Sequence, residues 1–228
     1  MRFITGIFFI ALTTGIPASA GTIASSVFTA NSEGWTALTA DSATTGLPVV
    51  QNLALTFNAT GGNPGGYVSV ADADNADTFF VAPVAFSGNL SAAINGSLVY
   101  NSITDQTADY AGPLVVIKGN GVTLVYQTGT QPAGVNVWNS VSVPIGPNAN
   151  WHVGTGGGSL ATLSDFQTVL ANVSAFWITA ETHNGVSETT GLDSVTLSST
   201  DSTVPEPSTV YYLGSGLLAA ATLLRRRG

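Results

Sequence analysis

Residues 113–127 read Pro-Leu-Val-Val-Ile-Lys-Gly-Asn-Gly-Val-Thr-Leu-Val-Tyr-Gln. Two short runs rich in β-branched residues lie on either side of a Gly-Asn-Gly segment, whose residues are typical of turns. In the second run, polar Thr123 lies between apolar Val122 and Leu124, an alternation that predicts a strand with one face toward solvent. This stretch therefore favours an all-β domain.

The same pattern continues across residues 21–203. Short runs of Val, Thr, Ile and aromatic residues are interrupted at intervals of about ten residues by Gly, Pro, Asn or Asp, which is typical of a sandwich or barrel. We predict strands over residues 22–30, 34–40, 53–58, 66–71, 78–81, 96–103, 113–118, 122–127, 137–143, 175–182 and 191–198. These strands suffice for the two sheets of a β-sandwich.

One short helix is expected within this domain. Ser164 and Gln167 have the spacing of a capping box, and Asp165 lies in the first turn. The apolar residues that follow the helical period are Phe166, Val169, Leu170 and Val173.

The charge distribution excludes several classes of function. Charged residues make up 8% of the chain, against about 25% in an average protein. Lys118 is the single cationic residue between residues 21 and 203, which also hold twelve of the thirteen acidic residues. Such a domain repels nucleic acid and attracts metal cations. Because the chain has no Cys, disulfides and thiol chemistry are excluded.

The first twenty residues have the pattern of a signal peptide. Arg2 is followed by a mostly apolar segment, residues 3–16, and then by Ala18, Ser19 and Ala20. Small residues at Ala18 and Ala20 define a cleavage site after Ala20. We therefore expect export, with residues 21–203 as the mature domain.

The other end combines an apolar segment with a cationic cluster. Residues 209–224 carry no charge and, as a helix, would span about 24 Å, against about 30 Å of bilayer hydrocarbon. Three consecutive arginines follow, and such a cluster stays on the cytoplasmic side. The preceding domain would thus face outward.

These C-terminal features together resemble the bacterial PEP-CTERM sorting signal, over residues 204–228. The motif comprises Val204, Pro205, Glu206, Pro207 and Ser208, and the cationic cluster comprises Arg225, Arg226 and Arg227. The resemblance implies a transient inner-membrane anchor, processing by an exosortase-type transpeptidase, and delivery to the cell surface or exopolysaccharide matrix of a Gram-negative bacterium. A plain short membrane anchor after a Pro-rich linker is the alternative.

The domain itself resembles the laminin B (domain IV) module. The resemblance rests on residues 26–35, the Gly-rich loop 61–67, residues 80–89, Trp138, Trp151, and residues 178–181 and 191–195. Position 194 departs from the laminin B pattern, because it holds Ser where we expect Asn. The resemblance implies a galactose-binding-like fold, that is, an all-β jelly-roll β-sandwich with one short helix.

The resemblance also implies a structural calcium ion. In this fold the first and last strands meet, which would bring Glu33 toward Asp193, with Asn31 and backbone carbonyls as further oxygen ligands. In the alternative, Glu33 caps a turn and Asp193 accepts hydrogen bonds from backbone amides. The acidic segment 72–77 lacks the Gly and Glu of an EF-hand loop, so we expect a solvated turn there, with Asp72 bonded to the Gly-rich loop and an ion as the second option.

No catalytic motif stands out. The histidines, His152 and His183, lack a zinc-binding spacing, so we predict a protein that is not an enzyme. Trp151, flanked by Asn150 and His152, is our candidate for an exposed indole that stacks on sugar rings, with a buried core residue as the alternative. The predicted function is binding of extracellular polysaccharide or another surface partner. A purely structural matrix component and a hydrolase that uses two carboxylates remain the alternatives.

Overall fold

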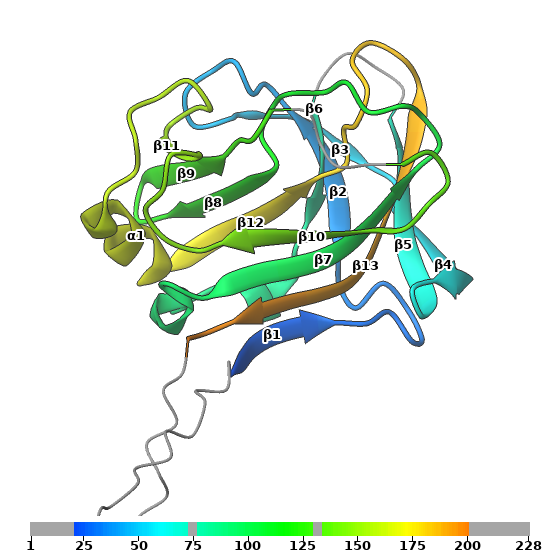
Figure 1. Cartoon of the computed structure of the whole chain (residues 1–228), viewed down its shortest axis with the longest axis horizontal. Helices are drawn as coiled ribbons and strands as arrows, with labels where there is room; N and C mark the ends of the chain where they lie inside the picture. Colours follow the sequence, from blue (N-terminus) through cyan, green and yellow to red (C-terminus); the bar gives the residue numbers. More distant parts are fainter. Residues whose placement is uncertain (1–20, 73–76, 130–133, 201–228) are drawn as a thin grey trace, which may run out of the picture. The chain divides into compact units, whose positions relative to one another are not determined.

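Two antiparallel β-sheets face each other in the computed structural model, which describes residues 21–72, 77–129 and 134–200 (Figure 1). The predicted all-β sandwich with one short helix is confirmed. The predicted signal peptide and sorting segment lie outside the described residues. Within those residues, no helix is long and apolar enough to cross a membrane.

The six-stranded sheet is built around its last strand, β13 (Glu188–Ser198). Its order is β10-β7-β13-β5-β4, and β1 also pairs with β13. The other members are β1 (Thr22–Ser26), β4 (Thr56–Gly62), β5 (Gly65–Asp72), β7 (Ser97–Thr104) and β10 (Asn139–Pro144). Along one edge, β13 pairs first with β5 and then with β1, while β7 follows its other edge. A bulge at Ser194, with φ of 51°, marks the change of partner.

The seven-stranded sheet has the order β11-β9-β8-β12-β6-β2-β3. Its members are β2 (Thr36–Ala40), β3 (Val49–Leu53), β6 (Asp77–Val81), β8 (Val115–Gly119), β9 (Val122–Tyr126), β11 (Trp151–Val153) and β12 (Val173–Thr179). Strands β8 and β9 form a hairpin whose turn residues, Asn120 and Gly121, both have positive φ, as a tight hairpin turn requires. The strands predicted from the opening segment are therefore present. Strands β3 and β11 were not predicted.

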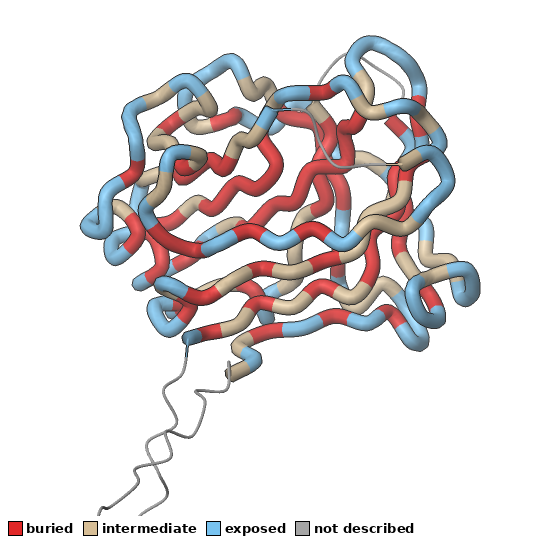
Figure 2. The backbone as a smooth tube through the Cα atoms, viewed as in Figure 1, coloured by how far each residue is buried: buried red, intermediate tan, exposed pale blue. Residues whose placement is uncertain are grey.

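The main core lies between the sheets. Alternate residues of β13 (Leu192, Val195 and Leu197) are buried there, and exposed residues gather on the loops (Figure 2). Trp35 lies between Phe28 and Phe86, with ring centroids 6.0 and 5.5 Å away. The Trp35 indole donates a hydrogen bond to Ser26 Oγ at 2.9 Å. These aromatic contacts anchor the segment between β1 and β2.

A second apolar cluster covers the opposite face of the seven-stranded sheet. It comprises Leu38, Ala40, Leu47, Phe79, Val116, Val125 and Trp177. The Lys118 ammonium lies 3.7 Å from the Trp177 ring centroid and donates to the Leu47 carbonyl oxygen at 2.8 Å. Desolvation lowers the pKa of Lys118 to about 8. The one Lys or Arg of the described residues thus packs against the fold instead of extending into solvent.

The short helix α1 (Leu163–Leu170) begins with a different capping box from the predicted one. Its cap is Thr162, whose hydroxyl accepts from the Asp165 amide, while the Asp165 carboxylate accepts from the Thr162 amide at 2.8 Å. The Ser164–Gln167 box is therefore wrong, because Ser164 already lies inside the first turn. The predicted apolar face is confirmed for the buried Phe166, Val169 and Leu170.

We expect Thr162→Ala to lower the free energy of unfolding by about 1 kcal/mol, because the Thr162 hydroxyl accepts the hydrogen bond of the Asp165 backbone amide in the first turn. Ser164→Ala, one residue inside the helix and equally exposed, is the matched control and should change little. Chemical denaturation of the full-length protein measures both. Equal losses in the two variants would contradict the assignment.

Candidate functional site

A groove of about 330 Å³ opens on the outer face of the six-stranded sheet. Its lining comprises Tyr67, Ser69, Ile103, Thr104, Asp105, Asn136, Thr189 and Gly191. Strands β5, β7 and β13 contribute most of these residues. Because Val68, Val70 and Leu192 are buried in the core, their neighbours along the strands must face the other side.

Gly191 forms the floor of the groove. A Cβ atom there would lie 2.7 Å from Ile103 Cγ2 and 3.0 Å from the Tyr67 ring. Since real Cβ atoms do not approach so closely, only glycine lets these two side chains lie across β13. The close packing fixes the Tyr67 ring over the sheet.

Tyr67 lines the groove, and Trp138 packs against it just outside the lining. Tyr67 and Trp138 meet edge to face, with centroids 5.3 Å apart and ring planes at 84°. The Trp138 indole donates to the Gly61 carbonyl oxygen at 2.9 Å, which ties it to the Gly-rich loop. Both rings are only partly buried. The pair therefore presents a fixed apolar surface to solvent.

Polar groups form another part of the lining. Asp105 Oδ1 accepts from the Thr189 amide at 2.9 Å, and the Asn136 amide donates to the Thr104 carbonyl oxygen at 2.7 Å. The side chains of Asp105, Asn136 and Thr189 are all exposed. An apolar ring surface together with carboxylate, amide and hydroxyl groups suits a ligand with both C–H faces and hydroxyls.

Trp151, predicted as a candidate exposed indole, is fully buried. Its indole donates to the Pro144 carbonyl oxygen at 2.7 Å, and its ring packs 5.1 Å from Tyr126 and 5.2 Å from Phe166. The exposed assignment is therefore wrong, and the core alternative is right. The polar residues before Trp151 belong to the turn that precedes β11. Their polarity therefore does not indicate whether the Trp151 side chain is exposed.

The groove residues were not predicted, although the sequence carries one signal for them. In residues 66–70, Tyr67 and Ser69 alternate with Val68 and Val70. This alternation places Tyr67 and Ser69 on the face opposite the core. No comparable local pattern marks Trp138.

The predicted calcium ligands lie in a tight turn and in the last strand. Asn31 Oδ1 accepts from the Glu33 amide at 2.7 Å, and Glu33 Oε1 accepts from the Phe28 amide at 2.8 Å. Phe28 and Glu33 both have positive φ, which shows how sharply this turn folds back. The structure thus places Asn31 and Glu33 in one turn.

Asp193 lies fully buried at the bulge of β13. Its carboxylate accepts from the amides of Asn63 and Ser194. Burial raises the pKa of Asp193, and the nearby Glu33 charge raises it further. The Glu33 charge thus acts on Asp193, and the backbone hydrogen bonds of the alternative are present. Oxygen atoms of this kind fit a hard cation, although no three His, Asp or Glu side chains within the described residues are grouped as a metal site.

The acidic segment after β5 also differs from expectation. Asp72 is 1% exposed and its Oδ1 accepts from the Thr78 hydroxyl at 2.8 Å. Asp72 is thus buried, and one of its hydrogen-bond partners, Thr78, lies on β6. Residues 73–76 lie outside the described part of the chain.

Comparisons with known proteins place the chain in a family. The chain is similar to the L4b domain of human laminin α2, with 14% identity over 64% of this chain and 90% of that one, and a TM-score of 0.48. It is also similar to a family 11 carbohydrate-binding module from Clostridium thermocellum, solved with a β-1,3-1,4-mixed-linked tetrasaccharide, with 14% identity over 78% and 96% of the two chains and a TM-score of 0.48. No curated protein matches the chain in sequence. The family model described as Laminin B (Domain IV) matches residues 79–210, which is more than half of the chain, and the protein therefore belongs to the laminin B (domain IV) family.

Proposed function

We propose that this protein is an exported surface or matrix protein whose laminin B sandwich binds extracellular polysaccharide in the groove over β5, β7 and β13. The observation that carries the proposal is the paired ring surface of Tyr67 and Trp138 together with the exposed polar groups of the groove. Aromatic rings stack on the C–H faces of sugars, and the polar groups offer hydrogen bonds to their hydroxyls.

The charge of the groove favours a neutral glycan. Asp105 is the acidic residue of the lining, and no Lys or Arg contributes to it. Lys118, the cation of the described residues, packs on Trp177 in the other sheet. An anionic polymer would therefore meet no compensating charge. Mixed-linked β-glucan is our first probe.

Export and sorting complete the proposal, on the sequence features of residues 1–20 and 204–228. In this scheme the signal peptide directs secretion, and the C-terminal segment anchors the protein briefly in the inner membrane. An exosortase-type enzyme then processes the Pro-Glu-Pro tail, and the domain reaches the surface or matrix of a Gram-negative bacterium. Nucleic acid is not among the proposed partners.

A hydrolase fits the groove less well, so we propose a binding protein that is not an enzyme. Glycoside hydrolysis uses two carboxyl groups on either side of the bond, about 5 to 9.5 Å apart. Asp105 has no second carboxylate beside it in the groove lining that the structure describes. A structural matrix component without a ligand remains the second candidate, and the binding measurement below separates it from the first.

A calcium ion at Asn31, Glu33 and Asp193 is also part of the proposal. It would join the turn after β1 to the bulge of β13, where the Glu33 charge acts on the Asp193 carboxylate. Neutralising both carboxylates would favour the folded state. Calcium supplies structural stabilisation in this scheme and takes no part in a reaction.

We expect Tyr67→Ala and Trp138→Ala each to raise the Kd for mixed-linked β-glucan at least tenfold, because each removes part of the ring surface. Tenfold corresponds to about 1.4 kcal/mol. Isothermal titration of the full-length protein in detergent measures this. Leu160→Ala, which truncates an exposed apolar side chain (57% exposed) outside the groove, is the control. Absence of saturable binding by the wild type, to this and other neutral glycans, would favour the structural component.

We expect calcium, added after chelation, to raise the Tm of the full-length protein, because an ion that binds only the folded state stabilises it by mass action. Glu33→Gln should lose part of this increase, since it removes one carboxylate ligand. Asp105→Asn removes an exposed carboxylate in the groove, outside this site, and should retain the full calcium-induced rise in Tm. A wild-type Tm that is unchanged by millimolar calcium would contradict the proposal.

A further inference from the structure

Four carboxylates from four different segments gather at one end of the sandwich. Asp72 ends β5, Asp77 begins β6, Glu181 follows β12, and Glu188 begins β13. We call these residues the acidic cluster. Asp72, Glu181 and Glu188 are only 1%, 3% and 2% exposed, although acidic residues are almost never so buried unless they are paired.

The backbone imposes this arrangement. Glu188 is directly opposite Asp72 in the register of β13 and β5, a position where two like charges are destabilising. The Glu181 amide donates to the carbonyl oxygen of Thr78, the residue after Asp77, at 3.1 Å. Sheet pairing and not side-chain flexibility therefore brings the acidic cluster together.

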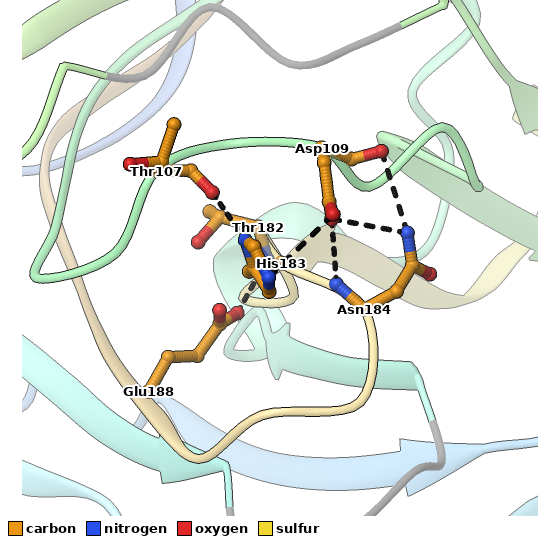
Figure 3. A network of polar contacts seen from close by, with 6 residues as sticks. All are labelled: Thr107, Asp109, Thr182, His183, Asn184 and Glu188. Carbon is orange, nitrogen blue, oxygen red and sulfur yellow. Dashed lines mark hydrogen bonds and ion pairs between the residues drawn. The ribbon is translucent and has the colours of Figure 1, made fainter.

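A network of polar contacts borders the cluster at Glu188 (Figure 3). Asp109 accepts from the Asn184 backbone amide at 2.7 Å and lies 3.5 Å from His183 Nε2, while His183 Nδ1 contacts the Thr107 carbonyl oxygen. The Glu188 carboxylate accepts from the Thr182 amide in the same network. These contacts fix the segment that carries Glu181 and Glu188.

Hydrogen bonding leaves part of the cluster unsatisfied. Glu181 Oε2 and Glu188 Oε2 are both buried and have no hydrogen-bond partner among residues 21–72, 77–129 and 134–200. No Lys or Arg of the described residues reaches them, since Lys118 is occupied on Trp177 and Leu47. Two buried carboxylate oxygens without a donor are costly unless something else compensates them.

The shifted pKa values in the cluster are consistent with buried carboxylates that lack a counter-ion. Burial, with the charges of Asp72, Glu188 and Asp77, raises the pKa of Glu181 to about 9. Burial also raises the pKa of Glu188. Burial among like charges therefore disfavours the ionised form of Glu181, as expected for carboxylates packed together without a counter-ion.

We infer that Glu181 and Glu188, with Asp72 and Asp77 beside them, bind a divalent cation, with calcium as the preferred ion. All the side-chain donors are oxygens, which suit hard cations and not zinc or copper. No three of the described acidic or histidine side chains are already grouped as a metal site. In our inference, the ion itself recruits the two Oε2 atoms and completes its shell with neighbouring oxygens and water.

The site is separate from the one proposed at Glu33. It lies at the start of β13, whereas Asp193 lies at the bulge further along the same strand. The two sites share no ligand. Each can therefore be removed without the other.

The test compares Glu181→Gln with Glu33→Gln in the full-length protein, by thermal unfolding in chelator and in millimolar calcium. Glutamine has the shape of the neutral acid, so Glu181→Gln should unfold in chelator at or above the wild-type temperature. The calcium-induced rise in Tm should be smaller in Glu181→Gln than in the wild type, because one of the two sites is weakened. Glu33→Gln should retain the contribution of the acidic cluster to this rise and lose only that of the Glu33 site. A full wild-type rise in Glu181→Gln overturns the inference and leaves the Glu33 site untouched.

Terbium luminescence provides a second measurement. Tyr110 is buried beside the cluster, close enough to Glu181 and Asp77 for their charges to raise its pKa. Terbium bound there should be sensitised by Tyr110, so Tyr110→Phe should lower the emission without weakening binding. Glu181→Gln should weaken terbium binding at least tenfold at this site. Emission and affinity that are unchanged in Glu181→Gln would again overturn the inference.

Discussion

The hydrogen-bond register of β13 is the constraint on which the rest of the structure depends. This strand pairs with three others, and it contributes residues to the groove, to the Asp193 site and to the acidic cluster. Glu188 faces Asp72 at its start, Gly191 underlies Tyr67 in the middle, and Asp193 is buried at the bulge. A shift of the pairing register by one residue would turn all three positions to the opposite face of the sheet and move the core residues to solvent.

Much of this fold follows from local sequence. The hairpin of β8 and β9, the strand with Tyr67 and the strand that ends the domain all have the apolar alternation that predicts them. Strand β3 was not predicted because it is an exposed edge strand without a buried face. Strand β11 was not predicted because it has only three residues. The helix was found, but Thr162 caps it because the carboxylate of Asp165 is in position to complete the box.

The functional features were harder to predict, because they depend on contacts between residues far apart in the sequence. Trp151 has polar residues on both sides in the sequence and yet fills the core, while Trp138, which follows Val137, contacts Tyr67 beside the groove. The pairing of Asp72 with Glu188 is a property of the sheet and leaves no local pattern. By contrast, a turn at Glu33 was one of the two alternatives raised from the sequence, and its hydrogen bonds are local.

The position of β1 has a consequence for how the chain acquires its structure. β1 is the first strand of the domain, and its partner in the sheet, β13, is the last (Figure 1). The pairing thus joins the two ends of the domain across most of its length. β5 and β7 also pair with β13 and not with each other, so the six-stranded sheet forms as one unit only when its last strand is in place. Such non-local pairing makes this an intrinsically slow topology.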